Sequence, residues 1–229
     1  MYQSYSRITR WRLLGALILD SNMNHKCIGV LDFGVGNILS IMNALKHADI
    51  NCLRVTQESQ FRNCSHLILP GVGSFSSGMK KLLLSDLHQE LNHEVVDKGK
   101  PILGICLGMQ MLSDVSYEFG THKGLGMIHG RVVELDSKKF GIPLPHIGWS
   151  EVRSENDLKL LAGIDSEADF YFVHSFHMEP SGDVKTGVSQ HGVDFVSVVE
   201  SGNIYGTQFH PEKSQSNGIK LLKNFSELA

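Results

Sequence analysis

Short apolar runs alternate with amphipathic stretches through the first half of the chain. The apolar runs span residues 27–33, 66–69 and 101–105. Stretches with apolar residues at helical spacing follow them, over residues 38–48, 79–95 and 109–112. Apolar runs this short are typical of buried parallel strands, whereas apolar residues repeating every three to four positions indicate helices. The second of these helices should end at Gly99. The alternation predicts a mostly parallel sheet covered by helices on both faces.

After about residue 125 the predicted helices give way to apolar runs separated by turn residues. These runs span residues 130–135, 170–173 and 194–199. Closely spaced strands without crossover helices favour antiparallel pairing, so we expect an antiparallel C-terminal extension of the same sheet. A last helix is expected around residues 218–228. Since neither an internal repeat nor a low-complexity linker divides the sequence, we predict one three-layer α/β domain over residues 26–229.

The first 25 residues differ from the rest of the chain. Three arginines precede the apolar run from Leu13 to Leu19, which loosely resembles a signal or transit peptide. The run is short, no small-x-small cleavage site follows it, and it could not span a bilayer as a helix. We therefore expect residues 1–25 to be an N-terminal extension, disordered or non-native, with Met23 as the natural start just before the first strand.

Composition and charge exclude several classes of function. Hydrophobic residues make up 41% and charged residues 20% of the 229 positions, which is ordinary for a globular domain. The formal charge of −3 provides no basic surface for nucleic acid, and no membrane partner is expected either. The four cysteines show no paired spacing, so we expect free thiols in a reducing compartment, the cytoplasm.

The sharpest candidate for chemistry is Cys106, which lies between Gly104 and Gly108, directly after a predicted strand and before a predicted helix. This is the nucleophile-elbow pattern with cysteine in place of serine. The glycines leave room for a tight, strained turn, and the start of a helix favours the thiolate over the thiol. The Leu107 N–H would point into the site and help to bind an oxyanion. A buried structural cysteine at a glycine-flanked strand end is the alternative.

His210 and Glu212 supply groups that a thiol nucleophile needs. Pro211 fixes the backbone between them, so both side chains can face the same way. The imidazole would take the thiol proton and return it to the leaving group, while the carboxylate orients the ring. Seen alone, His-Pro-Glu is also typical of a loop that ends a strand. The nucleophile elbow makes the catalytic interpretation much more specific.

With these elements placed, the chain resembles the class I, triad-type glutamine amidotransferases, which have a flavodoxin-like fold. More narrowly it is similar to the glutaminase subunits of imidazole glycerol phosphate synthases, from about Ile28 to Phe225. The resemblance rests on the joint order and spacing of several segments. They are Asp32–Asn37, Leu69–Phe75, Gly104–Leu112, Gly124–Gly126, Pro145–Trp149, Tyr171–Ser175 and Gln208–Ser214.

The resemblance implies further site residues. Gly71, Val72 and Gly73 match the oxyanion strand, whose backbone presents an N–H to the carboxamide oxygen of glutamine. Positions that hold the bound glutamine are matched by Gln110, Glu118, His174 and Ser175. For Glu118 a solvated acid remains the alternative, and for His174 a packed strand histidine.

The resemblance also implies a partner and a reaction. Asn37, Trp149 and Lys213 match the face that docks on a (βα)8-barrel cyclase subunit, although Trp149 also suits a core position. Glutamine would be hydrolysed to glutamate, and ammonia would pass through the partner of this heterodimer. The products would be imidazole glycerol phosphate and aminoimidazole carboxamide ribotide, in histidine biosynthesis. No metal or organic cofactor is expected, since none of the 12 histidines forms a recognisable ligand cluster.

Some segments depart from this pattern. Phe176-His177 stands where the histidine-pathway enzymes usually place two Tyr-like residues. Segments 118–126 and 213–216 also resemble a paralogous branch that supplies ammonia for amidino-sugar synthesis in surface polysaccharide assembly. Two other classes stay open: a stand-alone amidase or peptidase, and a binding protein without catalysis. Glutaminase activity of the isolated chain would separate the first of these from a channelling subunit.

Overall fold

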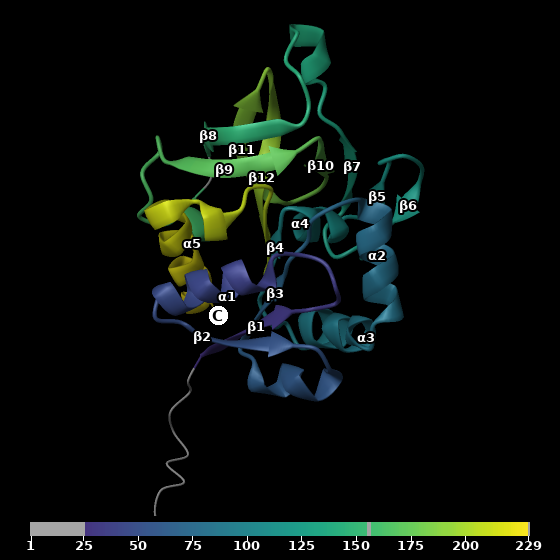
Figure 1. The fold of residues 1–229 in the computed structure, drawn as a ribbon, viewed down its shortest axis with the longest axis vertical. Coiled ribbons are helices and arrows are strands. Elements are labelled where there is room, and N and C mark those ends of the chain that lie inside the picture. The colour runs from purple at the N-terminus through teal and green to yellow at the C-terminus, as the bar shows by residue number, and fades with distance from the viewer. Residues whose placement is uncertain (1–25, 155–156, 229) are drawn as a thin grey trace, which may run out of the picture.

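The computed structural model describes residues 26–154 and 157–228 of the chain. The expected extension over residues 1–25 lies outside these ranges. The described residues form a central sheet flanked by helices, with smaller sheets at one end (Figure 1). None of the helices in the described ranges has the length and apolarity needed to cross a membrane.

The central sheet has seven strands in the order β11-β12-β13-β4-β3-β1-β2. Five neighbouring strands run parallel, and β12 and β11 extend the sheet in antiparallel fashion beyond β13. This arrangement confirms the predicted mostly parallel sheet with an antiparallel C-terminal extension. The strands are β1 (Cys27–Leu31), β2 (Asn51–Val55), β3 (His66–Leu69), β4 (Ile102–Ile105), β11 (Lys185–His191), β12 (Val193–Ser201) and β13 (Ile204–Thr207).

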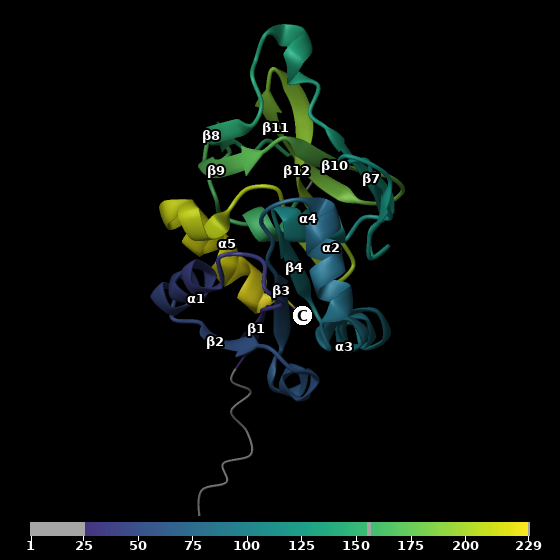
Figure 2. The same cartoon turned by 45° about the vertical axis from the view of Figure 1, so that its right-hand side comes forward.

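Helices cover both faces of the sheet, as Figures 1 and 2 show. On one face lie α1 (Ile38–His47) and α5 (Gln215–Glu227), and on the other α2 (Phe75–Leu84), α3 (Leu87–Asn92) and α4 (Leu107–Met111). Alternate residues of the buried strands feed the two faces, so the apolar core is divided into two clusters. In β3, Ile68 belongs to the cluster beneath α1 and α5, whereas Leu67 and Leu69 belong to the other.

One predicted helix is wrong. The stretch from Met79 to Val95 is not continuous, because α2 ends at Leu84 and is followed by α3 and a π-helical turn, His93–Asp97. Ser85 breaks the helix: its backbone is extended, and its hydroxyl donates to the Leu82 carbonyl at 2.7 Å. Such a local side-chain bond competes with the helical backbone bonds. The apolar period persists across the break since all the segments face the same core cluster.

Two of the three runs expected in the extended sheet lie elsewhere. Only the run 194–199 belongs to it, within β12. The run 130–135 falls on β7 (Gly130–Glu134), in a four-stranded sheet with β5 (Val115–Ser116), β6 (His122–Lys123) and β10 (Phe176–Pro180). The run 170–173 falls on β9 (Asp169–His174), which pairs with β8 (His146–Glu151). Strand periodicity identifies strands but not their partners, which explains the error.

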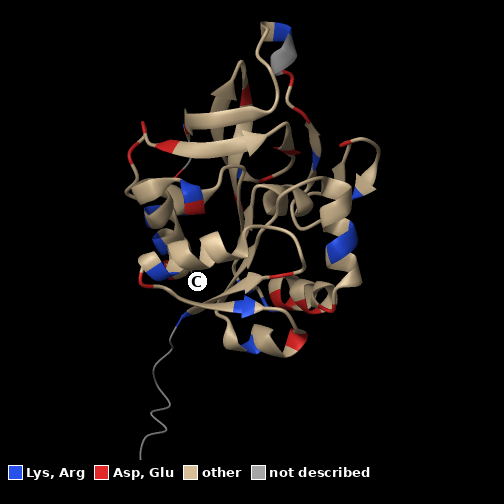
Figure 3. Cartoon of the chain, in the orientation of Figure 1, with Lys and Arg blue, Asp and Glu red and all other residues tan. Residues whose placement is uncertain are grey.

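Charges of both signs are spread over the helices and loops around the sheet (Figure 3). In α5 and the turn before it, Glu212 adjoins Lys213, and both Lys220 and Lys223 follow on the helix.

Candidate active site

Cys106 occupies a strained turn between β4 and α4. Its φ of 54° lies in the left-handed region, which residues other than glycine rarely adopt. A Cβ on Gly108 would lie 1.8 Å from the Leu69 carbonyl oxygen, and one on Gly104 would lie 2.7 Å from the Met109 backbone. Both glycines are therefore required by close backbone packing. The turn has the geometry of a nucleophile elbow.

The Cys106 side chain is mostly buried, with 7% exposed. Its sulfur lies 3.9 Å from the Val173 carbonyl oxygen and 3.7 Å from Gln208 Nε2. A thiol can donate to the carbonyl, whereas a thiolate can accept from the amide, so both protonation states have a partner. Gln208 is a contact that sequence patterns did not single out.

His210 reaches Cys106 through the sheet. β13 pairs in parallel with β4, opposing Thr207 to Ile105, and the Cys106 N–H donates to the Thr207 carbonyl at 2.7 Å. The chain continues from β13 into a 3-10 turn, Pro211–Lys213, directly after His210. Residues about 100 positions apart in sequence are thereby brought to the same end of adjacent strands.

His210 and Glu212 form a buried pair. His210 Nδ1 lies 2.9 Å from Glu212 Oε1, and the side chains are 3% and 2% exposed. Burial alone would lower the pKa of His210, but interactions with Cys106 and Glu212 outweigh it and raise this pKa to about 10. The imidazole is therefore protonated at neutral pH, next to the sulfur. Its Nε2 and Glu212 Oε2 are buried without a hydrogen bond among the described residues.

A cavity of about 330 Å³ adjoins the surroundings of Cys106, although Cys106 itself is not among the residues that line it. All four residues that the resemblance places around glutamine line it, together with Gly73. Val173, whose carbonyl contacts the cysteine sulfur, is also in its wall. The lining is Gly73, Gln110, Glu118, Phe119, Glu134, Pro145, Val173, His174, Ser175 and Phe176.

Two of these residues have roles within the protein as well. The Glu118 carboxylate accepts a hydrogen bond from the Phe75 N–H at the start of α2, so it is fixed and not merely solvated. Both ring nitrogens of His174 have protein partners, Phe176 O at 3.0 Å and His146 at 3.2 Å. The ring of His174 thus packs within the protein, although the residue borders the cavity.

The Gly71–Gly73 segment lies against the elbow. A Cβ on Gly71 would come within 2.8 Å of both the Gly108 nitrogen and the Leu107 side chain. Gly73 has a φ of 94°, and a Cβ there would meet open space. Leu107 begins α4, and the first N–H groups of a helix have no partner within the helix. The Leu107 N–H therefore has no partner within α4, and Gly71 packs directly against the first residues of that helix.

An aromatic pair lies next to His210, whose backbone N–H donates to the Tyr171 carbonyl at 2.9 Å. Trp149 on β8 is 45% exposed and contacts Tyr171 on β9 edge to face, with 5.8 Å between ring centroids. Lys213 Nζ lies 5.4 Å from the centre of the Tyr171 ring. Tyr171 therefore links Trp149 to Lys213. Asn37 is the N-cap of α1, where its side chain accepts a hydrogen bond from the Ser40 N–H at 3.3 Å.

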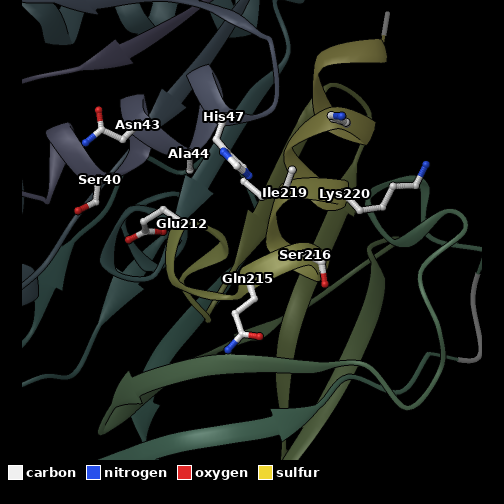
Figure 4. Close-up of a pocket in the computed structure, with 10 residues that line it drawn as sticks. Ser40, Asn43, Ala44, His47, Glu212, Gln215, Ser216, Ile219 and Lys220 are labelled. Carbon is white, nitrogen blue, oxygen red and sulfur yellow. The ribbon is translucent and has the colours of Figure 1, made fainter.

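A larger groove, of about 840 Å³, separates α1 from α5. Figure 4 shows Ser40 and Asn43 on α1 and Gln215 and Ser216 on α5, with Glu212 between the two helices. Glu212 thus lines the groove, while its carboxylate is buried, with the side chain 2% exposed, and pairs with His210.

The family model for the class-I glutamine amidotransferases matches residues 29–228. The chain belongs to this family. "Imidazole glycerol phosphate synthase subunit HisH" of Leptospira borgpetersenii is 43% identical over 205 residues, covering 88% of this chain and 100% of that protein. The HisH subunit of Methanocaldococcus jannaschii is 41% identical, covering 88% of this chain and 99% of that protein.

Solved structures of class-I amidotransferase folds are also similar. A glutamine amidotransferase crystal structure superposes with a TM-score of 0.68 at 21% identity, covering 86% of this chain and 96% of that one. The PurLQS structure from Thermotoga maritima gives 0.67 at 20% identity, covering 88% and 97%. Together with the mostly parallel sheet, these likenesses confirm the predicted fold class.

Proposed function

We propose that this class-I glutamine amidotransferase is the glutaminase subunit of an imidazole glycerol phosphate synthase, acting in histidine biosynthesis. Relatives named as HisH subunits at 41–43% identity over nearly their whole length support this assignment. The observation that carries the chemistry is the convergence of Cys106, His210 and Glu212 beside a cavity of suitable size for an amino acid. All four cysteines of the chain are free, which suits the cytoplasm.

The first half of the reaction uses the thiolate and the imidazolium. Cys106 Sγ attacks the carboxamide carbon of glutamine, and the resulting oxyanion is held by N–H groups of Leu107 and the Gly71–Gly73 backbone. As the C–N bond breaks, His210 gives its proton to the departing nitrogen and ammonia forms. The product on the enzyme is a γ-glutamyl thioester of Cys106.

The second half regenerates the enzyme. Neutral His210 takes a proton from water, whose oxygen attacks the thioester carbon, and the Cys106 thiolate leaves as glutamate is released. Glu212 supports the positive imidazole in both halves. Gln110, Glu118 and Ser175 are assigned to the amino-acid end of glutamine, since they line the cavity.

The partner in this proposal is a (βα)8-barrel cyclase that forms a heterodimer with this chain. We assign its docking face to Trp149, Tyr171 and Lys213, and to the α1–α5 groove that begins one turn after Asn37. An exposed tryptophan supported by a tyrosine and a lysine has the chemistry of an interface anchor. The groove reaches Glu212, so a docked partner would lie close to the source of ammonia.

We expect glutamate release from glutamine to be slow for the chain alone and to increase when a cyclase and its acceptor are added. Coupling energies between sites of 1–3 kcal/mol correspond to roughly 5- to 150-fold. The measurement compares the histidine-pathway ribotide with an amidino-sugar acceptor, each with its own cyclase. Stimulation by the sugar acceptor alone would move the chain to the polysaccharide branch. Fast turnover without any partner would identify a stand-alone amidase.

The docking face is tested by Trp149→Ala. Truncating an aromatic anchor that becomes buried in a complex costs about 2 kcal/mol or more of binding free energy, so the Kd for the cyclase should rise roughly 30-fold. Calorimetric titration of the two subunits measures it. Leu84→Ala removes an equally apolar, 76% exposed side chain from the end of α2 and should leave the Kd unchanged. Equal affinity for both variants would place the partner elsewhere on the surface.

A further inference from the structure

Two buried histidines that the proposed reaction does not use lie behind the glutamine cavity. His146 on β8 and His174 on β9 oppose one another in the strand pair, with His146 Nδ1 3.2 Å from His174 Nε2. Both residues are under 10% exposed. Buried polar rings of this kind cost free energy unless every nitrogen has a partner, and here each nitrogen has one.

With one proton on each ring, the Phe176 carbonyl at one end fixes the direction of every hydrogen bond. The Phe176 carbonyl can only accept, so His174 Nδ1 carries the proton and His174 Nε2 is an acceptor. His146 Nδ1 must then be the donor to it. His146 Nε2 in turn accepts from the Ser150 hydroxyl, 3.1 Å away. Burial lowers the pKa of His146 to about 4 and that of His174 to about 3, so both rings stay neutral with one proton each.

The chain of bonds continues from Phe176 to the nucleophile. The Phe176 carbonyl also accepts from Gln110 Nε2, at 2.8 Å. The same amide nitrogen donates to Gln208 Oε1 at 3.1 Å, and Gln208 Nε2 lies 3.7 Å from Cys106 Sγ. With its carbonyl oxygen engaged by Gln110, the Gln208 amide can present only its N–H groups to the sulfur.

We propose that His146 and His174 are positioning residues for the nucleophile: through Phe176 O and Gln110 they hold the Gln208 amide with its donor toward Cys106 Sγ. The inference rests on the proposed role of Cys106 as a nucleophile. If this series of hydrogen bonds is broken, the Gln208 amide is free to turn and place its carbonyl oxygen against the thiolate. Two electron-rich atoms would then repel each other. The orientation of Gln110, which faces the glutamine cavity, depends on the same carbonyl.

The test is the rate at which iodoacetamide alkylates Cys106 across pH, measured by mass spectrometry of the peptide that contains it. His146→Leu removes the hydrogen-bond donor to His174 but still fills the buried position with an apolar side chain. We expect alkylation roughly two- to tenfold slower near neutral pH, as for the loss of one buried hydrogen bond, with the profile displaced to higher pH. His146→Asn keeps an N–H donor near the position of Nδ1 and should recover most of the rate.

His191→Phe is the matched control. The His191 ring stacks on His146 with centroids 4.3 Å apart. Its own hydrogen bond goes to the Pro143 carbonyl, which is not part of the hydrogen-bond series from His146 to Cys106. A phenyl ring keeps the stacking, so the alkylation profile should match the wild type. Thermal unfolding of each variant verifies that it is folded.

The results distinguish a failure of this inference from a failure of the proposed function. A folded His146→Leu with the wild-type profile, or an equal loss of rate in His191→Phe, would overturn the positioning role. Wild-type Cys106 reacting no faster than Cys27 or Cys52 would instead contradict the proposed function. Slower alkylation in His146→Leu with recovery in His146→Asn is the outcome that supports the inference.

Discussion

Cys106→Ala is expected to abolish glutamine-dependent turnover, by on the order of 10⁴-fold or more, because it removes the atom that forms the thioester. The substitution should leave the fold intact. The turn at residue 106 has a φ of 54°, which alanine tolerates no worse than cysteine, and the contacts of the sulfur with Gln208 and Val173 are long, at 3.7 and 3.9 Å.

The measurement follows synthesis of product by the complex with the cyclase, supplied with either glutamine or ammonium salt. The variant should lose the first activity and keep the second, since free ammonia bypasses this subunit. Cys52→Ala, which removes a half-buried thiol on the edge strand β2, should keep both. Loss of both activities in Cys106→Ala would mean that the cysteine supports assembly and not chemistry. Glutamine use by the variant would point to another nucleophile.

Local chemistry explains how much of the fold could be predicted. The run His66–Leu69 is wholly buried between two helical layers. Three of its four residues are apolar and consecutive, which is the pattern that identifies β3 as a buried strand. β2 was missed because it lies at the sheet edge, where Asn51 and Arg54 are exposed and only one neighbour is needed. The break at Ser85 depends on one hydroxyl–carbonyl bond, which no periodicity of apolar residues reveals.

The candidate site was predictable where a motif carries its own geometry. Gly104 and Gly108 predict the tight turn at Cys106, because side chains at these two positions would collide with the neighbouring backbone. Gln208, Tyr171 and the His146–His174 pair were not predictable as contacts, since each depends on which strands pair. The register of β8 against β9 brings His146 opposite His174, and that register is set by tertiary packing.

Glu212→Gln is expected to lower turnover by roughly 10²- to 10⁴-fold, although it barely changes the shape of the site. Glu212 Oε1 accepts from His210 Nδ1, and an amide oxygen can do the same, so the ring stays in place. What is lost is the negative charge. Without it, burial and the Cys106 interaction alone act on His210, so its pKa falls below the value of about 10 that it has beside the carboxylate.

The sign of the pH effect follows from which form of His210 works. The proposed first step needs the imidazolium, to stabilise the thiolate and protonate ammonia, so activity should decline as pH rises through the His210 pKa. Lowering that pKa moves the alkaline limb of the kcat/KM profile to lower pH. Glutamate release measured from pH 5 to about 10 tests this. Glu179→Gln, which breaks an exposed 2.7 Å ion pair with Arg131, should keep the wild-type profile. An alkaline limb that does not move in Glu212→Gln would show that the carboxylate does not support the charge of His210.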